Sequence, residues 1–76
     1  MKKEIIKEKI TTNEYGVEKR QSLEKWYKTT DSGYEYNIEY VVQYYFIKSN
    51  TGYFRSYKKL SNAMKDSIVE RLMEVK

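Results

Sequence analysis

The sequence predicts an α+β domain, a four-stranded antiparallel β-meander with one C-terminal amphipathic helix packed on one face (ββββα). Along residues 34–48, apolar side chains alternate with polar ones, which is the two-residue period of a half-buried strand. Three short segments ending in glycine have the composition of hairpin turns, and after them the apolar period becomes helical. We expect 76 residues to form one small domain, residues 1–76.

The three turn segments divide the chain into four predicted strands. Each segment contains Asn, Asp, Ser or Thr, whose side chains can bond the turn backbone, and the segments are residues 13–16, 30–33 and 49–52. A type I turn followed by a glycine in the left-handed region makes a common three-residue hairpin loop. The strands are therefore expected at about residues 3–12, 18–29, 34–48 and 53–59.

The second predicted strand has a competing interpretation as a helix. Residues 17–28 contain Glu-Lys-Arg-Gln-Ser-Leu-Glu-Lys, which has good helix propensity, and their apolar side chains do not alternate cleanly. The turn segments at both ends favour a strand between two hairpins, because tertiary pairing often overrides local propensity. We expect a strand and keep the helix as the alternative.

The C-terminal segment predicts one helix over residues 62–75. Its apolar side chains recur at helical spacing and fall on one face, at Met64, Ile68, Leu72 and Val75. Ser61 is placed to serve as the N-cap of this helix.

The predicted strand pairing sorts the side chains onto two faces. Three-residue loops would place Trp26 opposite Ile38 and Tyr45 opposite Tyr57. The face under the helix would then hold the core, namely Trp26, Tyr36, Ile38, Tyr40, Val42, Tyr44, Phe46, Phe54 and Leu60. The other face would hold the candidate binding residues Lys19, Lys25, Tyr27, Tyr45, Tyr53, Arg55, Tyr57 and Lys59. A register different by one residue would exchange the two faces.

The composition argues against an enzyme. The chain has no cysteine and no histidine, so it offers no disulfide, no thiolate nucleophile, no imidazole base and no zinc site of the usual ligands. It has no glycine-rich phosphate loop, no nucleophile elbow and no calcium-loop pattern. We therefore expect a non-enzymatic binding protein without cofactor or metal.

The net charge of +4 and the pI of about 9.2 favour polyanionic partners in general. Nine tyrosines are many for this length, although Lys, Tyr, Ile and Asn are also what AT-rich coding sequence favours. This composition suggests a low-GC bacterium or one of its phages or mobile elements. No apolar run is long enough for a signal-peptide core or a membrane span, so we expect a cytoplasmic protein without membrane contact.

Aromatic rings among cations on a sheet face suit nucleic acid, because bases stack on rings while cations meet phosphates. The primary hypothesis is nucleic-acid binding, single-stranded rather than duplex, with DNA and RNA both open. The alternative is a phage or mobile-element protein that binds and inhibits a host protein, or forms a homodimer, through the same face. An ordinary solvated sheet face would have the same composition.

Overall fold

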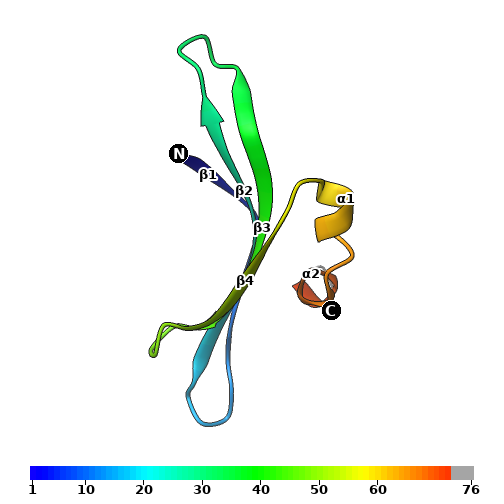
Figure 1. Ribbon diagram of the computed structural model, residues 1–76. Coiled ribbons are helices and arrows are strands. Elements are labelled where there is room, and N and C mark those ends of the chain that lie inside the picture. The colour runs from blue at the N-terminus through cyan, green and yellow to red at the C-terminus, as the bar shows by residue number, and fades with distance from the viewer. Residues whose placement is uncertain (73–76) are drawn as a thin grey trace.

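The computed structural model describes residues 1–72 and contains one antiparallel sheet followed by two short helices. The elements are β1 (Lys2–Thr12), β2 (Glu18–Thr29), β3 (Glu35–Phe46), β4 (Thr51–Tyr57), α1 (Leu60–Ala63) and α2 (Ser67–Leu72). The strand order is β1-β2-β3-β4, as Figure 1 shows, so the predicted meander is confirmed. The doubtful second segment is a strand.

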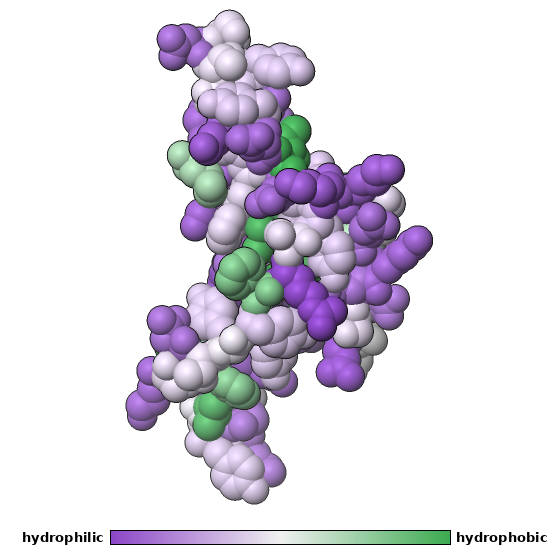
Figure 2. Space-filling view, viewed as in Figure 1, coloured by the Kyte–Doolittle hydropathy of each residue, from purple (hydrophilic) through white to green (hydrophobic). Residues whose placement is uncertain are grey.

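The sheet is long and twisted, and the helices cover only its middle. The molecule measures 48 × 24 × 19 Å. In Figure 1 both helices lie on one side of the sheet, while the β1–β2 and β2–β3 hairpins project beyond them in opposite directions. Figure 2 shows that the surface in this view is largely hydrophilic, with apolar side chains in small, separate patches. Both ends of the helix-bearing face are therefore left without a helix.

The first two predicted turns are confirmed. Gly16 and Gly33 adopt positive φ angles of 79° and 90°, which glycine tolerates without steric cost. Their N–H groups donate to the carbonyl oxygens of Asn13 and Thr30 at 3.0 and 2.9 Å. The Asn13 side chain also accepts two backbone N–H bonds, as expected for a turn-forming residue.

The third predicted turn is displaced. The connection between β3 and β4 is residues 47–50, and in it the N–H of Asn50 donates to the carbonyl of Phe46 at 2.9 Å. Gly52 is not a turn residue but pairs with Tyr45 inside β4. A Cβ on Gly52 would overlap the carbonyl oxygen of Tyr44, so this glycine permits a close approach of two backbones.

This displacement corrects the predicted pairing of β3 with β4. Tyr45 lies opposite Gly52, and Tyr57 lies opposite Tyr40. The observed register differs from the predicted one by an odd number of residues. The side chains of β4 therefore point to the faces opposite to those expected.

A β-bulge corrects the pairing of β2 with β3. The predicted register holds next to the turn, where Lys28 pairs with Tyr36, but beyond the bulge Trp26 pairs with Glu39. Asn37, at φ 52°, lies in the inserted segment of β3. From that point on, the pairing is one residue away from the predicted pairing.

The core lies between the middle of the sheet and the helices. It consists of Leu23, Val42, Ala63, Ile68, Val69 and Leu72, with Tyr40, Tyr44 and Tyr57 packed against it. Of the predicted core, Val42, Tyr40 and Tyr44 are on this side. The prediction was wrong for Trp26 and Phe54, which point to the opposite face, and for Tyr36, Phe46 and Leu60, which are exposed. Ile38 lies at the bulge and is half-buried.

The predicted single helix is divided into two. Lys59 rather than Ser61 is the N-cap of α1, and no side chain caps it. Asp66 begins the second helix, because its Oδ1 accepts the backbone N–H of Ile68 at 2.9 Å. Val75, the last residue of the expected apolar stripe, lies outside the described residues.

Candidate functional site

The candidate site lies on the helix-bearing face, toward the end of the sheet that carries the β1–β2 turn. Leu23 and Val42 pack on the helices, so residues in register with them, and every second residue along each strand, share this face. Pairing brings four side chains together at this end of the face. We call them the cation–tyrosine cluster: Lys19, Tyr44, Tyr53 and Arg55.

The cation–tyrosine cluster places two stacked rings between two cations. The rings of Tyr44 and Tyr53 are stacked, with centroids 6.0 Å apart and planes 23° apart. Lys19 Nζ lies 5.6 Å from the centre of the Tyr44 ring, and Arg55 Cζ lies 5.7 Å from that of Tyr53. Each cation is close enough for an electrostatic attraction to its ring. Lys19 therefore flanks the stacked pair across the sheet, on β2, and Arg55 flanks it along β4.

Each tyrosine of the stack has a different environment. Tyr44 is half-buried against the core and makes an edge contact with Phe46, whose ring centre is 6.0 Å away. Tyr53 lies on the edge strand β4 and is 47% exposed. Tyr44 thus supports the stack from the core side, and Tyr53 leaves it exposed.

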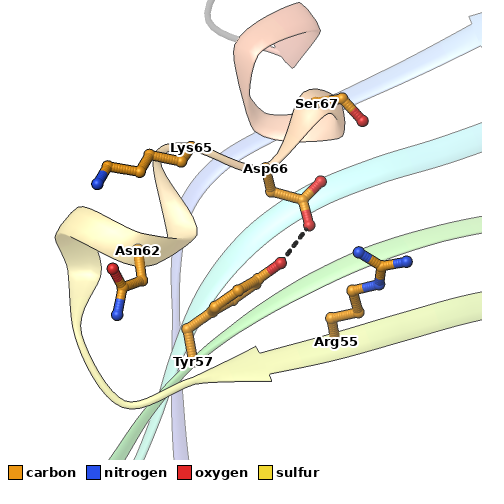
Figure 3. A pocket seen from close by; sticks show the side chains of 6 residues that line it. All are labelled: Arg55, Tyr57, Asn62, Lys65, Asp66 and Ser67. Atoms are coloured by element: carbon orange, nitrogen blue, oxygen red, sulfur yellow. Dashed lines mark hydrogen bonds between the residues drawn. The ribbon is translucent and has the colours of Figure 1, made fainter.

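Further cations surround the cluster. Lys9, Lys19 and Arg71 line a hollow of about 310 Å³ beside it. Arg55 and Lys65 line a second hollow, of about 410 Å³, between β4 and the helices (Figure 3). Among residues 1–72 none of these five cations forms an ion pair with a carboxylate, since the ion pairs found there use Arg20, Lys25 and Lys58.

Tyr57 has a structural role beside the second hollow. Its hydroxyl donates a 2.7 Å hydrogen bond to Asp66 Oδ2, as Figure 3 shows. This bond is the main reason that the pKa of Tyr57 is raised, with desolvation adding to it and Arg55 opposing it. Because the other oxygen of Asp66 caps α2, the Tyr57–Asp66 pair ties the start of α2 to β4.

Lys25 and Tyr27 share the helix-bearing face but lie toward its other end, where they meet acidic side chains. Lys25 Nζ is 2.7 Å from Glu35 Oε1, and the Tyr27 hydroxyl donates to Glu4 Oε1 at 2.9 Å. These bonds are the main reason that the pKa values of both Lys25 and Tyr27 are raised. The charge of Lys25 is therefore balanced by Glu35, and the Tyr27 hydroxyl is satisfied by Glu4.

The remaining two predicted residues lie elsewhere. Tyr45 is on the opposite face, where its ring centre is 5.9 Å from Arg20 Cζ. Lys59 is exposed at the start of α1. Of the eight predicted binding residues, the structure therefore gathers Lys19, Tyr53 and Arg55 into one cluster, with Tyr57 beside it.

Sequence reasoning missed four members of this surface: Lys9, Tyr44, Lys65 and Arg71. Tyr44 was assigned to the core, which it does contact, but its alternation with Val42 also placed it on this face. Lys65 lies at the break between α1 and α2, and Arg71 lies in α2 beyond it. Asp66, a strong capping residue inside the predicted helix, was the signal for that break.

The opposite face holds a polar network that the sequence did not predict. Arg20 donates to Glu8 Oε2 at 2.9 Å and to Glu24 Oε2 at 3.2 Å. Ser22 and the Trp26 indole N–H also donate to Glu24, at 2.8 and 2.9 Å. Burial alone would raise the pKa of Glu24, but these hydrogen bonds outweigh it and hold the pKa below its ordinary value. Both oxygens of the buried Glu24 are hydrogen-bonded, so the network is structural.

Two other kinds of site are absent from the described part of the chain. Residues 1–72 contain no group of three or more acidic side chains placed to hold a metal ion. No helix there has the length and apolar character needed to cross a membrane.

Comparisons of the chain with protein families, with curated proteins and with solved structures find no match.

Proposed function

We propose that this protein binds single-stranded nucleic acid through the cation–tyrosine cluster. The observation that supports the proposal is the stacked pair of Tyr44 and Tyr53 between Lys19 and Arg55, two cations that pair with no carboxylate among residues 1–72.

The rings supply a sequence-tolerant contact. An unpaired base stacks on an aromatic side chain with a gain of about 1–3 kcal/mol. Tyr53 is well exposed, and its stack on Tyr44 holds the ring in place before a ligand arrives. Such preorganisation lowers the entropy lost on binding. Bases within a duplex are already stacked on each other, so exposed rings favour a single strand.

The cations supply a path for the phosphate backbone. Lys9 and Arg71 lie on the β1 side of the cluster, and Lys65 lies on the β4 side. A strand that crosses the sheet over the cluster would therefore meet positive charge on both sides of the rings. Each phosphate contact releases counterions, which makes binding salt-dependent.

Titration of a fluorescent single-stranded oligonucleotide at several salt concentrations tests this proposal. We expect Tyr53→Ala to weaken binding roughly 5- to 100-fold, because one stacked base is lost, and Tyr53→Phe to retain most of it. Arg55→Ala should weaken binding and reduce the slope of log K against log salt by about 0.7, because one phosphate contact is lost.

Matched controls lie far from the cluster. Tyr34, 71% exposed beside the β2–β3 turn, and Lys28, exposed near the end of β2, are equivalent residue types outside the proposed path. Tyr34→Ala and Lys28→Ala should leave binding close to that of the parent protein. An absence of binding at low salt, or an equal loss in the control variants, would refute the proposal.

A second candidate function, binding of a host protein, is favoured by the opposite face. Phe54 is 63% exposed there, and Ile5 and Ile10 are exposed on the same face. Aromatic and aliphatic anchors of this kind are typical of protein interfaces. A host protein retained from nuclease-treated lysate by Arg55→Ala, but lost with Phe54→Ser, would support this function over the first.

A further inference from the structure

We propose that β1 pairs antiparallel with β1 of a second copy of the chain, forming a two-fold dimer joined edge to edge. β1 is an outer strand of the sheet, with β2 on one side only. It is eleven residues long, and every residue except Thr11 is exposed. A long strand with an uncovered edge is a template for pairing with another strand.

The charge pattern of β1 is self-complementary. If the two-fold axis passes between Ile5 and Ile6, Lys3 faces Glu8 of the second copy and Glu4 faces its Lys7. Because the interface is symmetric, each of these pairs occurs twice. Opposite charges directly across two strands stabilise the pairing.

The bulge in β1 makes this register sterically consistent. In a regular strand, Glu4 and Lys7 would point to opposite faces and could not face each other in such a dimer. Here the register with β2 shifts between Ile5 and Lys7, so Glu4 pairs with Lys25 and Lys7 pairs with Leu23. Both therefore point to the helix-bearing face, which is what the proposed charge pair requires.

The second charge pair, Lys3 with Glu8, also joins two residues of the same face. Lys3 pairs with Trp26 and Glu8 pairs with Ser22, so both point away from the helices. The Lys3 ammonium lies 4.1 Å from the centre of the Trp26 ring, and Arg20 already bonds one oxygen of Glu8. The other oxygen, Oε1, has no hydrogen bond among residues 1–72 and can accept one from Lys3 of the second copy.

Apolar side chains fill the remaining positions of this register. Ile5 would lie beside Ile6 of the second copy at the axis, and Met1 would lie beside Ile10 at each end. All four are exposed in the single chain, from 42% for Ile6 to 76% for Met1. Pairing would remove part of this apolar surface from water.

Neighbouring registers of the two β1 strands would be less favourable for pairing. A shift by one residue in either direction would set residues of opposite faces against each other, such as Glu4 against Glu8 or Lys3 against Lys7, which this dimer does not allow. The proposed register retains one like-charge pair, Lys2 with Lys9. The other edge strand, β4, has one cation and no acidic residue, so it offers no charge complementarity to itself.

Sedimentation of the nuclease-treated chain over a concentration series tests the dimer, with a mass of twice 9.3 kDa expected at the high end. Lys7→Glu should raise the dissociation constant roughly tenfold, since it creates two like-charge pairs with Glu4. Lys2→Glu makes the same change of net charge, but should lower the dissociation constant because it removes the repulsion with Lys9.

Lys28→Glu is the matched control, since it changes the charge by the same amount on β2, away from this edge, and should leave the dissociation constant unchanged. Mixing Lys7→Glu with Glu4→Lys should restore association, because only the mixed dimer has both charge pairs complementary. A parent chain that stays monomeric at every concentration would overturn the proposal. So would Lys7→Glu and Lys2→Glu shifting the dissociation constant in the same direction.

Discussion

Asp66 is the residue that most changes the C-terminal part of the molecule from what the apolar period predicts. Its two carboxylate oxygens accept bonds from the Ile68 N–H and the Tyr57 hydroxyl, and the side chain is buried. The period of the apolar residues shows which face of a helix packs, but not whether the helix is interrupted. Ser61 has the residue type of a cap, but the capping carboxylate is that of Asp66, five residues later, at the start of α2.

Removal of either partner of the Tyr57–Asp66 bond should destabilise the fold. We expect Tyr57→Phe to lower the free energy of unfolding by about 1–3 kcal/mol, because a buried carboxylate loses a hydrogen bond. Asp66→Ala should cost more, since the cap of α2 is lost as well. Ser61→Ala, at the position expected from sequence, should change stability by less than about 0.5 kcal/mol. Urea denaturation followed by circular dichroism measures all three, and an equal effect of Ser61→Ala and Asp66→Ala would contradict this assignment.

The lowered pKa of Glu24 predicts how the stability of the fold depends on pH. Its pKa in the folded state is lowered, so its ionised form contributes stability above its ordinary pKa of 4.5. This contribution is lost as the pH falls from 4.5 through the lower folded-state pKa. In Glu24→Gln, stability should therefore fall less steeply with acidification over that window. Thermal melts of both proteins across it provide the measurement, and identical slopes would show that Glu24 is not a source of acid sensitivity.

At the scale of the elements, the strands were predictable and their alignment was not. The alternation in β3 and the first two turns predicted the meander, because period and turn chemistry are local properties. The bulges at Ile6 and near Asn37 are not local signals, and neither residue differs from its neighbours in a way that marks an insertion. Each shifts the register by one residue, which is enough to move side chains to the other face.

Gly52 gives a prediction at this scale. Gly52→Ala should weaken the β3–β4 pairing, because its Cβ would overlap the backbone at Tyr44 and Tyr45. Gly16→Ala meets no neighbouring atom, so it should cost only the conformational penalty of its positive φ, about 1–2 kcal/mol. Unfolding free energies compare the two variants. A smaller loss for Gly52→Ala than for Gly16→Ala would contradict the observed register.

At the scale of the whole molecule, a small core stabilises only the middle of a long sheet. The core joins Leu23 and Val42 of the sheet to a few buried side chains of two short helices, and the chain has no cysteine to add a covalent link. The ends of the sheet therefore remain open, and one of them carries the cation–tyrosine cluster. The fold class followed from the sequence. The membership of the two faces did not, because it depends on bulges and on the position of the third turn.

The proposed dimer would join two such sheets edge to edge, each with its own cation–tyrosine cluster. A two-fold axis perpendicular to the sheet leaves the helices of both copies on the same side, so both cation–tyrosine clusters would face one way. A longer strand could then engage both clusters, which would raise the apparent affinity through effective concentration. The proposed binding of short oligonucleotides does not depend on the proposed dimer.

The most direct test of the proposed binding surface is a titration of the ¹⁵N-labelled protein with a short single-stranded oligonucleotide, followed by backbone amide chemical shifts. We expect the largest changes at Lys19, Tyr44, Tyr53 and Arg55, with a decrease as salt is added. Amides of Tyr34 and Lys28, far from the cluster, should stay within the background. Changes centred elsewhere, or no changes at low salt, would contradict the claim that this cluster is the nucleic-acid site.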